Sequence, residues 1–145
     1  MNQSGTPEYS ARGVALGLFV GFVVPLGLQL VAAIVLAYLL KANKVLSALF
    51  TFISNPYTVT VIYPFQCWFG SVLLGNPIPY EVITGAFGEF FQSPSLKALL
   101  VLGRLMEQEL LVPFFFAGAL FGVISAVIGY VVAFWLITRY RKRKE

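Results

Sequence analysis

The sequence predicts an all-α integral membrane protein, and three observations carry this prediction. Hydrophobic residues make up 59% of the 145 residues, only 11% are charged, and the mean hydropathy is +0.84. An ordinary soluble domain carries about 25% charged residues, because polar groups must cover its surface. Three stretches without any charged residue are long enough to cross the roughly 30 Å of bilayer hydrocarbon as helices. They are residues 13–40, 45–75 (uncharged as far as residue 80) and 110–138.

The composition also excludes several classes of function. The 14 Phe, 7 Tyr and 2 Trp exclude a disordered chain. A single cysteine, Cys67, excludes an intrachain disulfide framework and a thiolate zinc cluster. Neither Asp nor His occurs, which removes the usual metal ligands and the Ser-His-Asp triad. We therefore expect no enzyme, no metal, no cofactor and no nucleic-acid partner.

Charged residues divide the chain into an amino-terminal leader (1–12), one polytopic membrane domain (13–138) and a basic tail (139–145). Basic flanks stay in the cytoplasm, so we expect a cytoplasmic C-terminus. The tail anchors this topology or docks on anionic lipid head groups. Residues 76–109 have two basic and four acidic residues, which suits the outer side. The basic residues of the tail are Arg139, Arg141, Lys142, Arg143 and Lys144.

Pro25 and Gly27 interrupt the first stretch, which as one helix of 28 residues would be about 42 Å long. Two arrangements remain open. In one, the stretch is a kinked helix that spans once and leaves the amino terminus outside. In the other, residues 13–24 and 27–40 form a re-entrant hairpin, with Arg12 and Lys41 on the cytoplasmic face.

Asn55 and Pro56 divide the second stretch, because a residue before proline avoids the α region. Residues 45–54 then form only about 15 Å of helix. Asn55 suits an N-cap and Pro56 the first helical position. We expect a spanning helix from Pro56 to Gly75, broken or kinked at Pro64.

Residues 76–109 are expected to form interfacial helices. The segment 80–92 mixes phenylalanines with two glutamates, which is typical of such a helix. Ser93-Pro94 predicts the start of a second helix that runs to about Leu111. Arg104 and Glu107 are three residues apart on it and are expected to pair. Pro113 then marks the break before the last span.

Two series of glycines recur every fourth residue, and such small residues let helices approach closely. They pack within the chain or form an interface in a homo-oligomer or larger membrane complex. The series are Gly13-Gly17-Gly21 and Gly118-Gly122.

Several of these residues together resemble a bacterial family catalogued as domain of unknown function twenty sixty-two. The resemblance covers about residues 10–138 and implies a small inner-membrane protein, sometimes joined to lipid-linked glycosyltransferase domains. The residues that carry it are Gly13, Gly17, Gly21, Pro25, Gly27, Gln29, Asn43, Ser54-Asn55-Pro56-Tyr57-Thr58, Gly70 and Leu74-Gly75.

Polar residues in apolar stretches are the functional candidates, because they are costly in hydrocarbon. Interrupted membrane segments point to transport sites, and helix N-termini favour anions. We therefore expect membrane lipids as partners and a site for an anionic lipid or lipid-linked carrier near the two breaks, unless these residues are purely structural. The alternative is a non-catalytic scaffold or accessory subunit. The candidate ligand-binding residues are Gln29, Lys44, Asn55, Pro56 and Thr58.

Overall fold

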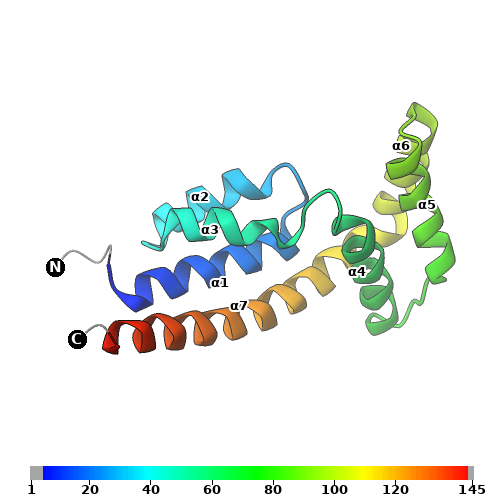
Figure 1. Ribbon diagram of the computed structural model, residues 1–145. Helices are drawn as coiled ribbons and strands as arrows, with labels where there is room; N and C mark the ends of the chain where they lie inside the picture. Colours follow the sequence, from blue (N-terminus) through cyan, green and yellow to red (C-terminus); the bar gives the residue numbers. More distant parts are fainter. Residues whose placement is uncertain (1–4, 144–145) are drawn as a thin grey trace. The chain divides into compact units, whose positions relative to one another are not determined.

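A computed structural model describes residues 5–143, and this part of the chain is helical and contains no strand, as the sequence predicts (Figure 1). It forms two compact units. Unit 1 joins the residues up to Ser54 with those from Ala119 onward, and unit 2 is Asn55–Gly118. One helix, α7 (Leu111–Lys142), contributes to both units.

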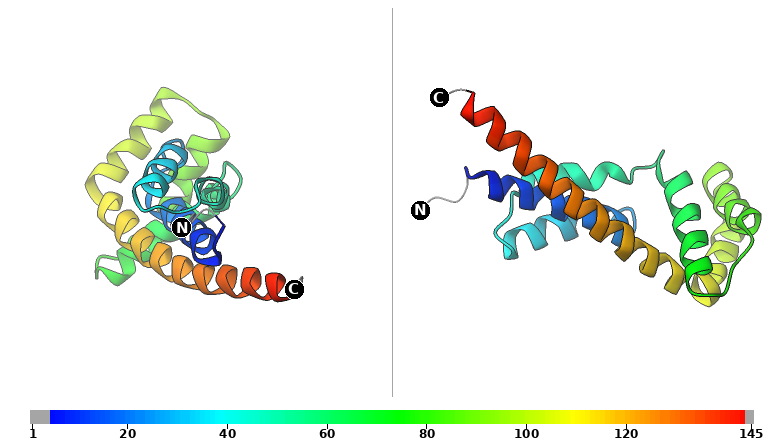
Figure 2. Two further views of the ribbon diagram at one scale, coloured as in Figure 1. Left: turned by 90° about the vertical axis from the view of Figure 1, so that its left-hand side faces the viewer. Right: turned by 90° about the horizontal axis from the view of Figure 1, so that it is seen from below.

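Unit 1 is built on three consecutive helices and the carboxyl-terminal part of α7 (Figures 1 and 2). The three are α1 (Pro7–Val23), α2 (Gln29–Leu39) and α3 (Lys44–Phe50), the last extended by a 3₁₀ turn, η1 (Thr51–Ile53). The turn that contains Pro25 and Gly27 reverses the chain, so α2 returns along α1. The first apolar stretch is therefore a helical hairpin in this structure.

The helices α1 and α3 are in backbone contact through a row of glycines. A methyl group added at Gly13 would lie 2.5 Å from the carbonyl oxygen of Asn43, and one at Gly21 would lie 3.1 Å from that of Thr51. A methyl group at Gly17 would meet the carbonyl of Ser47. The pairs 13/43, 17/47 and 21/51 keep a constant offset of 30 residues, so α1 and α3 run parallel. This glycine series packs within the chain.

Local signals explain where α1 and α2 begin and end. The Thr6 hydroxyl accepts a hydrogen bond from the Tyr9 N–H, and Pro7 occupies the first turn, so α1 begins inside the predicted leader. At the end of α2, Ala42 N–H bonds the Ala37 carbonyl and Lys41 N–H bonds the Tyr38 carbonyl. This is a Schellman motif, and its left-handed position is held by Lys41, with φ of 51°.

Unit 2 packs four helical segments around an aromatic core. They are α4 (Val59–Leu73), α5 (Tyr80–Gln92), α6 (Leu96–Leu105) and the first turns of α7, with a π-helical turn, η2 (Met106–Leu110), before α7. Tyr63 makes edge-to-face contacts with Phe87 and Phe114. The buried cluster comprises Val59, Tyr63, Cys67, Ile78, Ile83, Phe87, Leu102, Leu110 and Phe114.

Neither Pro64 nor Pro113 ends a helix, so the predicted helix breaks at these two prolines are wrong. Pro64 lies fully buried within α4, where packing of the surrounding face outweighs the lost hydrogen bond. Before Pro113, the Leu111 N–H bonds the Met106 carbonyl, five residues earlier. This π turn shifts the hydrogen-bond register, and the helix continues through Pro113. Likewise, the N-cap of α6 is Ser95, whose hydroxyl accepts from Ala98 N–H, not the Ser93-Pro94 pair.

Within the described residues, one helical segment is long and apolar enough to cross a membrane. It runs from Leu96 to Lys142, and its most apolar window is almost entirely unburied. The other two apolar stretches are divided into helices of 17, 11, 7 and 15 residues. The structure thus shows fewer candidate spans than the three that the sequence predicts.

We predict opposite effects for Gly17→Ala and Gly103→Ala. The first methyl meets the Ser47 carbonyl, so unfolding free energy should fall by about 1–3 kcal/mol. No atom lies within 4 Å of the second, so alanine's helix propensity should raise stability by about 1 kcal/mol. Circular dichroism during unfolding in mixed micelles measures both. Equal stabilisation by both substitutions would contradict the packing described for α1 and α3.

Candidate functional site

The Gln29 side chain belongs to a buried polar network beside the turn that contains Pro25 and Gly27. Gln29 is 3% exposed, and its Nε2 donates to the Ser54 carbonyl at 2.8 Å. The Ser54 hydroxyl lies 2.6 Å from the Gly21 carbonyl and 2.7 Å from Gln29 Oε1. One hydroxyl carries one proton, so these two acceptors share it. The network joins the end of α1, the start of α2 and the end of η1.

The Asn55 side chain caps the helical turn that begins unit 2. Its Oδ1 accepts hydrogen bonds from the N–H groups of Tyr57 (2.9 Å) and Thr58 (3.2 Å). In return, Asn55 N–H donates to Thr58 Oγ1 at 2.9 Å. This reciprocal pattern is that of a capping box. Pro56 lies between the partners, where its missing N–H leaves no donor unpaired.

The structure therefore brings Gln29 together with Ser54, and Asn55 together with Thr58, each pair within its own unit. In both places the polar side chains bond the protein's own backbone at a helix end. A ligand site shared by the two breaks stays a prediction.

Ser47 and Thr51, which are not among the candidates predicted from the sequence, extend the polar face of α3. Ser47, Thr51 and Ser54 are fully buried, and the Ser47 hydroxyl lies 3.3 Å from the Ala33 carbonyl. Their spacing of four and three residues places them on one helix face. This spacing is visible in the sequence and is the pattern that predicts a polar stripe packed against another helix.

Basic residues gather at one end of unit 1. Asn43 N–H bonds the Tyr9 carbonyl and Arg141 donates to the Gly5 carbonyl, so the start of α1, the α2–α3 turn and the end of α7 meet there (Figure 1). The described part of unit 1 has seven basic residues and one acidic residue, Glu8. The seven are Arg12, Lys41, Lys44, Arg139, Arg141, Lys142 and Arg143; Lys144 lies outside the described residues.

Two of these cations lie over aromatic rings. Lys44 Nζ is 4.7 Å from the centre of the Tyr38 ring, and the Arg139 guanidinium is 4.8 Å from that of Trp135. Such pairs hold cations beside amphipathic rings, which are enriched at membrane–water interfaces. We name the seven cations, with Tyr38 and Trp135, the basic end of unit 1.

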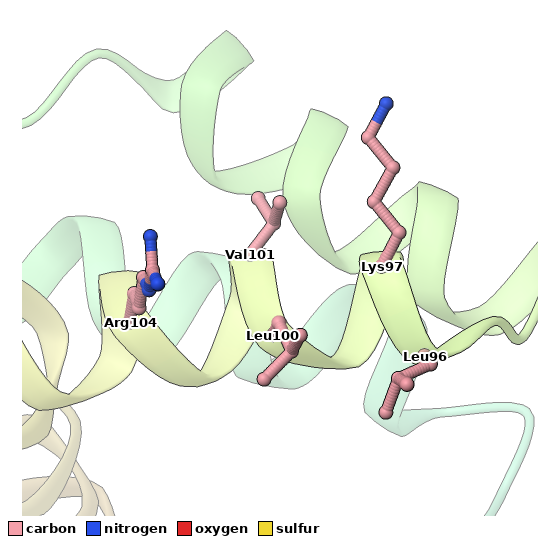
Figure 3. A pocket seen from close by; sticks show the side chains of 5 residues that line it. All are labelled: Leu96, Lys97, Leu100, Val101 and Arg104. Atoms are coloured by element: carbon pink, nitrogen blue, oxygen red, sulfur yellow. The ribbon is translucent and has the colours of Figure 1, made fainter.

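No ion pair between Arg104 and Glu107 is found among the described residues, so their predicted pairing is not confirmed. The chain changes from α to π geometry between the two, so residues three apart no longer share a face. Arg104 instead extends on the same side of α6 as Lys97, beside an open groove of about 520 Å³ (Figure 3). Leu96, Leu100 and Val101 form the rest of its lining.

Of the two remaining predicted packing residues, Gly122 contacts its own unit. A methyl group at Gly122 would lie 3.0 Å from the Phe19 ring. Gly118 is buried. In unit 2, Gln66 Nε2 donates to the Phe114 carbonyl at 2.8 Å, and a methyl group at Gly70 would meet the Pro113 carbonyl. Cys67, which lies between Gln66 and Gly70 in the sequence of α4, is a buried free thiol.

Comparison with known proteins gives one match. The model of a family described as "Uncharacterized protein conserved in bacteria (DUF2062)" matches residues 1–145, the whole chain. No curated protein and no solved structure matches the chain.

We predict that Ser54→Ala lowers the unfolding free energy by about 1–3 kcal/mol, because it leaves the buried Gln29 amide and Gly21 carbonyl without their hydroxyl partner. In a double-mutant cycle, Gln29→Leu should cost less in the Ser54→Ala background than in the native chain. Thr84→Ala removes an exposed hydroxyl that bonds the Tyr80 carbonyl and serves as control. Additive effects of the two substitutions would refute a shared network.

Proposed function

The chain belongs to the DUF2062 family of bacterial proteins, and from this premise we propose that it is a multi-pass protein of the inner membrane that binds an anionic lipid or lipid-linked carrier. Binding occurs at the basic end of unit 1, which faces the cytoplasm. The composition, the apolar exposed surface of α7 and the charge distribution support this proposal.

The two units carry charge of opposite sign. The described part of unit 1 has seven basic and one acidic residue, a net charge of +6. Unit 2 has two basic residues (Lys97, Arg104) and four acidic residues, a net charge of −2. Because basic segments stay in the cytoplasm, this asymmetry supports a cytoplasmic basic end and an outward placement of the polar parts of unit 2. The contact between Arg141 and Gly5 supports the same side for both termini.

The lengths of the helices in unit 1 fit a re-entrant arrangement. The helices α2 and α3–η1 have 11 and 10 residues, or about 16 and 15 Å, half of the hydrocarbon thickness. Backbone that turns inside a membrane must have its polar groups satisfied by protein. The Gln29–Ser54–Gly21 network meets this requirement at the end of unit 1 opposite the basic end.

The observation that carries the proposal is the backbone of Lys41. The chain ends α4 with the same Schellman motif, and there the left-handed position holds Gly75, with φ of 78°. A left-handed conformation costs a residue with a side chain roughly 1–2 kcal/mol. Such strain concentrates at functional sites. A lysine held there at this cost supports a function for its charge, and an anionic head group is the partner that matches it.

A scaffold or accessory subunit is the alternative that the glycine faces suggested. Gly13, Gly17, Gly21 and Gly122 contact residues of their own unit, so these faces are occupied within one chain. This favours lipid binding over assembly through glycines.

We predict that Lys41→Gly raises the unfolding free energy by roughly 1 kcal/mol and weakens binding of phosphatidylglycerol about fivefold, since one interfacial cation contributes about 1 kcal/mol. Lys41→Arg keeps both charge and strain and should change neither property. Nanodisc titration with phosphatidylglycerol or phosphatidylcholine measures binding. If Lys41→Gly binds phosphatidylglycerol as the native protein does, the proposed role of this charge is wrong.

Topology gives a separate prediction. The substitution Ser4→Cys, made in a Cys67→Ser background, introduces one cysteine near the amino terminus. This cysteine should resist a membrane-impermeant thiol reagent in intact cells and react with it after lysis. A cysteine at Asn76→Cys, in the acidic half of the chain, should react in intact cells. Labelling of the Ser4→Cys protein in intact cells would place the amino terminus outside and exclude the arrangement proposed for unit 1.

A further inference from the structure

A groove in unit 1 begins beside Arg12 and continues along α1. It has a volume of about 380 Å³, within the roughly 300–1,000 Å³ typical of small-molecule sites. Arg12, Ala15, Leu16 and Phe19 line it from α1, Leu40 and Ala42 from the α2–α3 turn, and Ala126 from α7. From Arg12 to Phe19 the wall extends about 10 Å, or two helical turns.

The lining of this groove is apolar except for one cation. Three alanines, Ala15, Ala42 and Ala126, stand where larger side chains would fill it. Leu16, Phe19 and Leu40 supply apolar walls. Arg12 is the charged group among the lining residues, and Lys41 lies between two of them in sequence. A ligand that matches this pattern has a hydrocarbon part next to an anion.

We propose that the groove holds one acyl chain of an anionic glycerophospholipid, with the phosphate at Arg12. This inference rests on the proposed function and locates its site. The Arg12 Nε donates to the Glu8 carbonyl of the preceding turn, which orients the guanidinium. Its two terminal nitrogens bind the phosphate as a planar fork, a geometry that suits arginine better than lysine.

The shape and chemistry of the groove favour this ligand over others. Free phosphate would make no use of the apolar walls, and a neutral lipid would leave Arg12 without an anion. Because the groove is open, the second acyl chain stays in the surrounding bilayer. Lys41 and Lys44 flank Ala42 and attract the same head group.

The test is lipid retention by the full chain in mild detergent, measured by native mass spectrometry with added phosphatidylglycerol or phosphatidylcholine of identical acyl chains. Ala126→Trp fills the groove and Arg12→Gln removes its cation. Each should reduce retained phosphatidylglycerol at least about fivefold, the factor that corresponds to ~1 kcal/mol. Val127→Trp, on an exposed neighbouring position of α7, and Lys97→Gln, which removes a cation of unit 2, should leave retention unchanged.

The outcomes separate this inference from the proposed function. Full retention by both Ala126→Trp and Arg12→Gln, with loss in Lys41→Gly, overturns the groove and leaves lipid binding at the basic end in place. If the native chain retains phosphatidylcholine as well as it retains phosphatidylglycerol, both the groove assignment and the proposed anionic-lipid binding are overturned. If the mass of the co-purified ligand is that of a polyprenyl phosphate, the assignment to glycerophospholipid is wrong. If Ala126→Trp does not fold, Ala15→Leu narrows the same groove from α1.

Discussion

Unit 1 depends on the close approach of two helix backbones. Van der Waals contact between two helices is greatest where small residues let their backbones approach closely. Gly13, Gly17 and Gly21 allow α1 to lie directly on α3, in a parallel register with an offset of 30 residues. That register brings Asn43 to Tyr9 at one end and Ser54 to Gly21 at the other. The basic end and the buried polar network are therefore both consequences of one packing contact.

Unit 2 reaches stability by different means. Its core is aromatic, with Tyr63 placed edge-to-face against Phe87 and Phe114, and geometry of this kind adds to the free energy of burial. Close backbone contact occurs where Gly70 meets Pro113. Cations dominate the described part of unit 1, whereas acidic residues outnumber basic ones in unit 2. Packing and charge thus differ together between the two units of one short chain.

The helical class and the family follow from the sequence, and both are confirmed by the structure and the family match. The bounds of α5, Tyr80–Gln92, were predictable because turn residues flank an amphipathic segment. Three features were not. Nothing local distinguishes a kinked helix from a hairpin at Pro25, the partner of Ser54 lies 25 residues away at Gln29, and a π turn that accommodates Pro113 has no sequence signature. Each depends on contacts that local propensity does not encode.

The two parts of unit 1 lie far apart in the sequence, so they are synthesised at different times. The α1–α2–α3 part of unit 1 leaves the ribosome before unit 2, and the part of α7 that completes unit 1 begins at Ala119. All of unit 2 is synthesised in the interval. Translation adds about 5–20 residues per second, so several seconds pass between the synthesis of α1 and that of Ala126, which lines the same groove. During that time the face of α1 that later meets α7 stays uncovered, and a stall in translation would prolong this interval.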